Sequence, residues 1–241
     1  MSEFSKKKDQ YWNAANDTAD KRLSLNKIFV ASLCGLLLFF CLVCVSVTIT
    51  LNFRPLYYLD IKLLDISGIS GYSSDVIRKN YNVLIDYNNI WYTGALNFPD
   101  FVMSESGRIH FEEVKKVFGV FEYGALILLP ISIALIAVAK KKRFESVFLA
   151  AGIFSIGIPA AFGLLIAVNW EWVFVTFHKM VFQNDYWLFD PYTDPVILIL
   201  PDEFFMHCAA LILLFVVAGS IAFFAAGKRV QKQSMRMKDK K

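Results

Sequence analysis

The sequence contains few of the residues from which metal sites and disulfides are built, with four cysteines and three histidines among 241 residues. The cysteines all fall within long apolar runs, where a free cysteine acts as a small apolar side chain. None lies in a segment expected to face an oxidising exterior, and no cysteines and histidines share metal-site spacing. We therefore expect no disulfide, metal ion or organic cofactor. The cysteines are Cys34, Cys41, Cys44 and Cys208.

Signatures of the common soluble enzyme classes are also missing. The chain has no G-x-S-x-G nucleophile turn and no cysteine placed beside a base. It has neither a P-loop nor a Rossmann glycine pattern. These absences argue against a serine or cysteine hydrolase of the usual kind and against a nucleotide-binding enzyme.

The sequence does contain long runs of apolar residues. Apolar residues make up 56% of the chain, aromatic residues make up 16%, and the mean hydropathy is +0.48. This excess is concentrated in four runs, each long enough for a helix of about 20 residues to cross a bilayer. Core helices of soluble proteins rarely stay apolar on every face. The sequence predicts an all-α polytopic membrane protein with transmembrane helices over residues 28–51, 117–139, 144–168 and 204–227.

The first apolar run could also be read as a cleaved signal peptide, because basic residues precede it. It is longer than a signal-peptide core, however, and no A-x-A cleavage site follows it. We therefore interpret residues 28–51 as a transmembrane helix.

Basic residues predict the orientation of the four helices. The arm 1–27, the link 140–143 and the tail 228–241 hold 17 of the 25 Lys and Arg residues. Cytoplasmic loops collect Lys and Arg, so both termini and the link are expected inside the cell. The net charge of +4 then reflects topology and anionic lipid, and we expect membrane lipid but no nucleic acid as a partner.

The two outer segments differ in size. The larger, 52–116, is predicted to form a small extracytoplasmic cap. Its middle should be a helix starting at Ser73 or Ser74, after a turn or loop over 66–71. The next transmembrane helix is expected to begin near Ser104 to Gly107, well above its apolar part. The apolar positions of the cap helix are Val76, Ile77, Tyr81, Leu84 and Ile85.

The second outer segment, 169–203, is predicted to contain an interfacial amphipathic helix. Its apolar residues recur at helical spacing, and tryptophans suit the membrane–water interface. A stretch rich in turn residues follows, and Pro201-Asp202 is typical of a helix start. The apolar residues of the expected helix are Trp170, Val173, Phe174, Phe177 and Val181.

All three histidines fall on the outer side in this topology, and histidine can both take and give a proton near neutral pH. His110 should lie about 10 Å above the apolar part of its helix, with Glu113 one turn further on. His178 borders the interfacial stripe, and His207 is interpreted as an interfacial anchor or helix-face donor. Taken singly, each could be an ordinary interface residue. Glu122 stands within a predicted transmembrane helix, where it is either functional or snorkels to the interface.

Two segments resemble the Gram-positive membrane family of the lipoprotein intramolecular transacylase. Residues 105–118 (ESGRIHFEEVKKVF) are similar to the family's acid and histidine stretch, which continues with an acid, Val and Lys. Residues 177–187 (FHKMVFQNDYW), continuing to Asp194-Pro195 and Pro201, are similar to its His-x-x-x-Phe and Asn-Asp-x-Trp stretch. Glu113 departs from the family pattern, which has Asp there.

The resemblance implies an acyltransferase without cofactors, acting at the outer side of the plasma membrane. Its substrate would be a diacylated lipoprotein whose sn-2 acyl chain moves to its own N-terminal Cys α-amine, giving lyso-form lipoprotein. The resemblance assigns the catalytic pair to His110 and His178. Further expected substrate-binding or supporting residues are Glu105, Arg108, Glu113, Asn184 and Trp187, of which Glu113 is expected to orient the ring of His110.

Two alternatives remain open at this point. An accessory membrane protein would use the cap for docking and the histidines as interface residues. A transporter would place charged residues along a central path, but only Glu122 qualifies, and no inverted repeat is visible.

Overall fold

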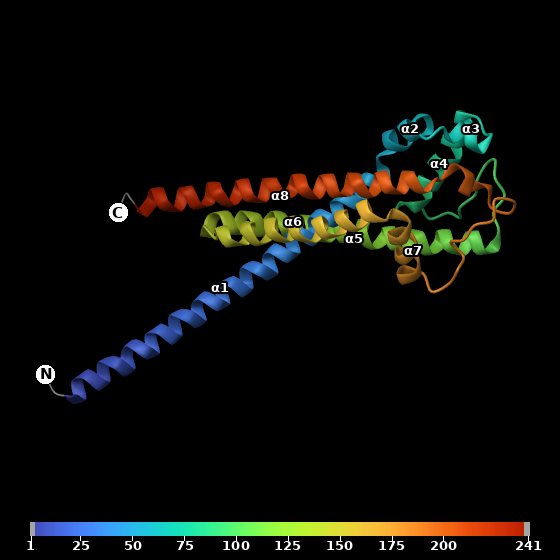
Figure 1. Cartoon of the computed structure of the whole chain (residues 1–241). Helices are drawn as coiled ribbons and strands as arrows, with labels where there is room; N and C mark the ends of the chain where they lie inside the picture. The colour runs from blue at the N-terminus through green and yellow to red at the C-terminus, as the bar shows by residue number, and fades with distance from the viewer. Residues whose placement is uncertain (1–2, 239–241) are drawn as a thin grey trace.

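The computed structural model describes the backbone of residues 3–238 and the side chains of residues 24–237. The outermost parts of the two basic arms lie outside these residues. Four long helices dominate: α1 (Glu3–Asn52), α5 (Glu105–Lys142), α6 (Glu145–Val168) and α8 (Asp202–Lys238). The shorter helices gather around one end of this bundle, opposite the turn between α5 and α6 (Figure 1). The fold is all-helical in its described residues, as the sequence predicts.

The four long helices are all apolar and long enough to cross a membrane. At about 1.5 Å per residue, the 38-residue α5 is about 57 Å long, well beyond the roughly 30 Å of a bilayer core. A helix of this length extends beyond a bilayer core, and its apolar part begins near Val117. At the other end, Arg143 adopts a left-handed conformation (φ 56°) that ends α5 before α6 begins.

Small residues allow α1 to sit at the centre of the bundle, in contact with α5, α6 and α8. A Cβ atom on Gly35 would lie 2.6 Å from the Cβ of Ala150 in α6, so only glycine permits this approach. Between α6 and α8, the buried hydroxyl of Ser220 donates to the carbonyl oxygen of Gly152 at 2.9 Å. Such contacts hold helices together where lipid removes the hydrophobic driving force between them.

The cap consists of α2 (Arg54–Leu63), α3 (Ile66–Ser70) and α4 (Ser74–Asn88). Ser73 is the N-cap of α4 and accepts from the backbone N–H of Val76, which agrees with the sequence analysis. The prediction of a turn or loop over 66–71 is wrong. Asp65, in a left-handed conformation, accepts from the N–H of Gly68, and Gly71 (φ 76°) ends a five-residue helix.

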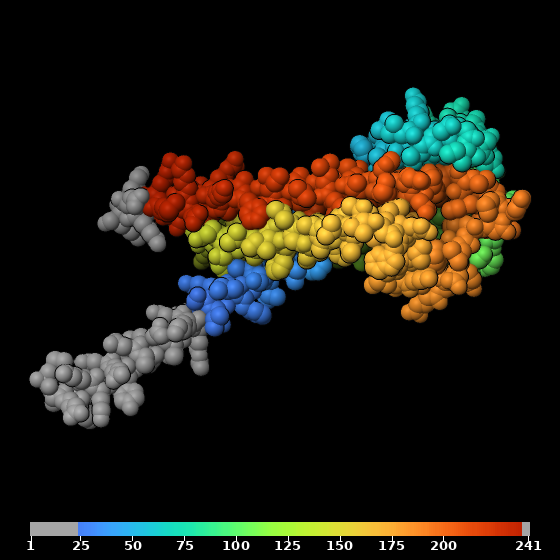
Figure 2. Space-filling model, in the orientation of Figure 1, coloured from blue at the N-terminus to red at the C-terminus, as the bar shows by residue number. Residues whose placement is uncertain are grey.

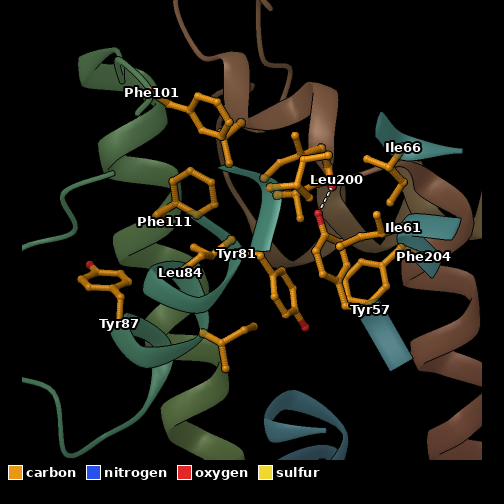
Figure 3. Close-up of a cluster of buried hydrophobic side chains, with 14 of the residues drawn as sticks. Tyr57, Ile61, Ile66, Tyr81, Leu84, Tyr87, Phe101, Phe111, Leu200 and Phe204 are labelled. Atoms are coloured by element: carbon orange, nitrogen blue, oxygen red, sulfur yellow. Dashed lines mark hydrogen bonds between the residues drawn. The ribbon is translucent and has the colours of Figure 1, made fainter. Parts of the chain in front are cut away.

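An aromatic cluster joins the cap to the start of α8. The rings of Tyr57 and Tyr81 stack with centroids 3.6 Å apart, and Phe204 packs edge-on against Tyr57 (Figure 3). The Tyr57 hydroxyl donates to the carbonyl oxygen of Ile199 at 2.6 Å, in the 3-10 helix η1 (Pro195–Ile199). The cap is thus held by buried aromatic packing and a satisfied hydroxyl rather than by disulfides.

Glu122 has a structural partner. Its carboxylate is buried and accepts from the backbone N–H of Ile90 at 2.9 Å, in the loop after α4. The snorkelling interpretation is therefore wrong for this side chain: it faces protein, and it fastens the cap loop to α5.

The predicted interfacial helix is α7 (Trp170–Val181). Asn169 ends α6 and caps α7, because its side-chain oxygen accepts from the N–H of Trp172 at 2.9 Å. Helix α7 and the loop after it form a lobe beside the outer ends of α6 and α8 (Figure 2). Trp172, Phe177 and Met180 are exposed on this helix, as suits an element lying against lipid.

Candidate functional site

Two histidines from different outer segments meet at the end of the bundle. His110 lies on the second turn of α5, and His178 lies on the last turn of α7. Their ring centroids are 6.2 Å apart, and their planes are tilted by 31°. His110 is buried and His178 is half-buried, so both imidazoles lie in one site that is partly shielded from water.

Aromatic rings surround both imidazoles. Phe182, the residue that ends α7, lies 4.8 Å from His110 and 5.6 Å from His178, measured between ring centroids. Trp187 lies 4.9 Å from His178, and Phe189 lies 5.3 Å from His110. These rings keep water from the histidines and fix their orientation. They also offer apolar surface of the kind that a lipid substrate would contact.

The tautomer of His178 follows from its hydrogen bond. Its Nδ1 lies 2.7 Å from the carbonyl oxygen of Phe174. A carbonyl oxygen only accepts, so Nδ1 carries the proton and, in the neutral ring, Nε2 keeps a free lone pair. Burial lowers the pKa of His178, while the Phe174 carbonyl and the charge of Asp202 act in the opposite direction.

His110 is the more strongly perturbed of the pair. Burial, with a smaller contribution from His178, lowers its pKa from 6.5 to about 4. The ring is therefore neutral at pH 7. Among the residues that the structure describes, its buried Nδ1 has no hydrogen-bond partner, and neither has the buried indole Nε1 of Trp187. Unpaired buried polar atoms are costly, and here they stand beside a candidate base, where a substrate could pair with them.

Glu113 and Asn184 join the two motif segments. The side-chain amide of Asn184 lies 3.0 and 3.2 Å from the two carboxylate oxygens of Glu113. The oxygen of Asn184 accepts from the N–H of Tyr186, which shapes the turn leading to Trp187. Within the described residues no hydrogen bond joins Glu113 to His110, so the expectation that Glu113 orients that ring finds no contact in the structure.

Arg108 and Glu105 lie on another face of α5. The guanidinium of Arg108 pairs with the carboxylates of Glu105 and Glu112 along the helix. Positions two apart on a helix point in different directions, so Arg108 does not share a face with His110. The structure gives these residues a local helix-stabilising contact rather than a place beside the histidines.

His207 also lies apart from this pair. Its Nδ1 is 2.9 Å from both carboxylate oxygens of Asp60, which is almost fully buried in α2. The interpretation of His207 as a helix-face donor agrees with this contact, which ties α8 to the cap.

Sequence reasoning missed Phe182, Phe189 and Asp194 as parts of the site's surroundings. Phe189 packs on His110 and stacks on Phe111. The sequence indicated them only by position: Phe182 lies within the second motif segment, and Phe189 and Asp194 lie in its continuation. Among the described residues no group of three or more His, Cys, Asp or Glu could hold a metal ion. The two neutral imidazoles and the indole can carry out proton transfer and hydrogen bonding.

Comparison with known proteins gives a consistent result. A family model described as lipoprotein intramolecular transacylase Lit matches residues 32–205. The membrane integral lipoprotein intramolecular transacylase Lit from Bacillus cereus is 37% identical, over 87% of this chain and 98% of that chain, with a TM-score of 0.83.

Two further structures of the Bacillus cereus protein, each with a histidine replaced, are also similar. The arginine variant is 35% identical over 93% of this chain and 99% of that chain. The alanine variant is 36% identical over 92% and 99%. Both have a TM-score of 0.78. A search of curated protein sequences gives no significant match.

Proposed function

Because the chain belongs to the lipoprotein intramolecular transacylase family, we propose that it moves an acyl chain within a diacylated lipoprotein. The acyl group on the glyceryl sn-2 oxygen passes to the α-amine of the same lipoprotein's N-terminal cysteine. The product carries one amide-linked and one ester-linked acyl chain, which is the lyso form. The enzyme is an acyltransferase that needs no external acyl donor.

The observation that carries this proposal is the meeting of His110 and His178. One comes from α5 and the other from α7, yet their rings lie 6.2 Å apart within an aromatic enclosure. An accessory protein would have no need of two desolvated imidazoles so close together. Amine attack on an ester needs groups of this kind, because a proton must leave the nitrogen, a proton must reach the departing oxygen, and the charge that develops on the carbonyl oxygen must be stabilised.

His178 is the better placed general base. Its Nδ1–H is held by the Phe174 carbonyl, so the lone pair on Nε2 is free to accept a proton. The α-amine attacks the ester carbonyl, a C–N bond forms, and the amine proton passes to Nε2. The imidazolium then returns this proton to the glyceryl oxygen as the C–O bond breaks. Protons balance, and the ester becomes an amide and a free hydroxyl.

His110 and Trp187 are suited to stabilise the charge that develops on the carbonyl oxygen. With its pKa lowered to about 4, His110 stays neutral and acts as a hydrogen-bond donor rather than a charged acid. The unpaired indole N–H of Trp187 is a second donor beside His178. Preorganised donors of this kind, in a site that excludes water, contribute several kcal/mol of transition-state stabilisation.

The reaction is intramolecular, so the protein's main task is orientation. Donor ester and acceptor amine are already on one molecule, and holding them in a reactive geometry removes much of the entropic barrier. Glu113 and Asn184 support this geometry by fastening the Trp187 segment to α5.

We place the site on the extracytoplasmic side of the plasma membrane. Support comes from the basic residues, which concentrate in the two termini and the 140–143 link. The turn between α5 and α6, which contains this link, lies at the opposite end of the bundle from α7 (Figure 1). The exposed apolar face of α7 would lie against the outer leaflet, where the acyl chains of a lipoprotein are anchored.

The direct test uses purified protein in nanodiscs with a synthetic lipopeptide. The lipopeptide carries a diacylglyceryl thioether on an N-terminal cysteine with a free α-amine. Substrate and product have the same mass, so alkaline ester hydrolysis precedes tandem mass spectrometry and leaves only amide-linked acyl chains. We expect an N-acyl cysteine fragment from this substrate and none from its N-acetylated analogue. No N-acyl product from the free amine, with folded protein, would overturn the proposal.

A further inference from the structure

Asp194 is a buried acid that the proposed reaction does not use. It is 2% exposed and lies just before η1. One carboxylate oxygen accepts from the backbone N–H of Ser104 at 2.8 Å, and the other accepts from the hydroxyl of Thr193 at 2.8 Å. Ser104 is the N-cap of α5, the helix that carries His110. The carboxylate thus sits at the positive end of this helix, which favours a negative charge there.

Gly107 has no side chain and so leaves room for the Asp194 carboxylate against α5. A Cβ atom at position 107 would lie 2.3 Å from Oδ1 of Asp194 and 3.1 Å from Cε1 of Phe189. The absence of a side chain at 107 therefore lets the end of the second outer segment rest directly on α5. Gly107 stands one turn before His110, on the side of the helix that faces this segment.

The segment between Asn184 and Asp194 is fastened to α5 at both ends. Asn184 bonds to Glu113, and Asp194 bonds to Ser104. Between these ties lie Trp187, against His178, and Phe189, against His110. A displacement of either tie would move Trp187 or Phe189, two of the rings that enclose the histidines.

We propose that Asp194 is a positioning residue: seated against Gly107, its carboxylate holds Phe189 on His110 and keeps that histidine buried. This inference rests on the proposed function for its catalytic consequence. Its structural consequence, the enclosure of His110, stands independently of any reaction. Asp194 acts through Phe189 and α5 and does not touch the reacting atoms.

Four variants in nanodiscs test the contact: Gly107→Ala, Asp194→Ala, the double variant G107A/D194A, and Asp194→Asn. Asparagine keeps an oxygen that can accept from the Ser104 N–H, so D194N is the conservative control. The first readout is the rate of carbethoxylation of each histidine by diethyl pyrocarbonate, followed by peptide mass spectrometry. His207 serves as the internal reference, because its contact with Asp60 lies on the cap side of α8.

We expect G107A and D194A to raise the labelling of His110 relative to His207 about fivefold or more, and D194N to leave the ratio near wild type. In the double variant, the methyl group added at position 107 takes space that the carboxylate vacates. Adding G107A to D194A should therefore change the ratio by less than twofold. A general loss of folding would instead raise the labelling of all three histidines together.

The second readout is the transacylation rate on the synthetic lipopeptide. We expect G107A and D194A to lower kcat at least tenfold with a smaller change in KM, and D194N to retain most of the wild-type kcat. An unchanged His110-to-His207 labelling ratio in both G107A and D194A overturns the positioning proposal, whatever the activity. Altered ratios with no activity in the wild type would overturn the proposed function instead.

Discussion

The carboxylate of Glu113 accepts from the side-chain amide of Asn184 at 3.0 and 3.2 Å, and this contact joins the two sequence motifs in space. One motif lies at the start of α5, and the other begins at the end of α7. The turn that Asn184 forms with Tyr186 leads directly to Trp187, which packs on His178. The contact therefore links the helix of one histidine to the surroundings of the other.

Exchanging the roles of these two side chains tests the link. Asn184→Asp alone places two carboxylates together, and we expect at least a tenfold loss of lipopeptide transacylation. Glu113→Gln in the same chain restores an amide facing a carboxylate, so E113Q/N184D should recover most of the activity. If the double variant is no more active than N184D, the hydrogen bond does not position the site.

Substitution of the histidines tests their chemical roles. A general acid–base group typically contributes about 10² to 10⁴ in rate, so we expect H178A to lose at least about 10². A donor to a developing oxyanion contributes about 10² to 10³ in kcat, so we expect a loss of about 10² or more in H110A. H178N is the matched control for structure, since its amide nitrogen can still donate to the Phe174 carbonyl while Nε2 is gone. It should keep the wild-type unfolding temperature and lose activity. Wild-type rates from folded H178N would remove His178 from the mechanism.

The indole N–H of Trp187 can be removed without removing most of the aromatic surface. Trp187→Phe keeps a ring against His178 but has no donor for the carbonyl oxygen. Loss of one such donor costs about 10² to 10³ in kcat where it serves a developing oxyanion. We expect W187F to lower kcat at least tenfold with little effect on KM. An increase in KM alone would instead assign Trp187 to substrate binding.

The pH dependence of activity follows from burial of the histidines. The base must be neutral, and burial lowers the pKa of both His178 and His110, the latter to about 4. Below about pH 8 the substrate's α-amine becomes protonated, so activity should decline gradually; the further loss caused by protonation of His178 should come only below about pH 6.5, the ordinary pKa of histidine. The charge of Asp202 raises the pKa of His178, so Asp202→Asn should shift this acid limb to lower pH. A shift to higher pH would contradict the assignment of His178 as base.

The sequence predicts the parts of this molecule that depend on local pattern. Long apolar runs identify the four membrane helices, and spacing identifies α7, because bilayer and interface impose simple periodicities. Ser73 could be named as an N-cap because capping depends on a few adjacent residues. The motif resemblance brought His110 and His178 together before any geometry was known.

What the sequence does not reveal are contacts between distant residues. Nothing local indicates that Glu122 will accept from the N–H of Ile90, or that Asp60 will face His207. Asp65 in a left-handed conformation starts α3 where glycine and serine composition predicted a loop. The partner of Glu113 was also misjudged, because helical spacing brings it near His110 while the tertiary fold brings Asn184 to it.

The most direct test of the account is the N-terminal chemistry of lipoproteins in a cell. The gene is expressed in a host that lacks such an enzyme and makes diacylated lipoproteins with free α-amines. Tandem mass spectrometry then locates the acyl chains on the N-terminal cysteine. The account predicts lyso-form lipoprotein, with one acyl chain moved to the amine, from the wild-type chain and not from H178N. Unchanged diacyl lipoprotein alongside well-expressed, membrane-inserted wild-type protein would contradict it.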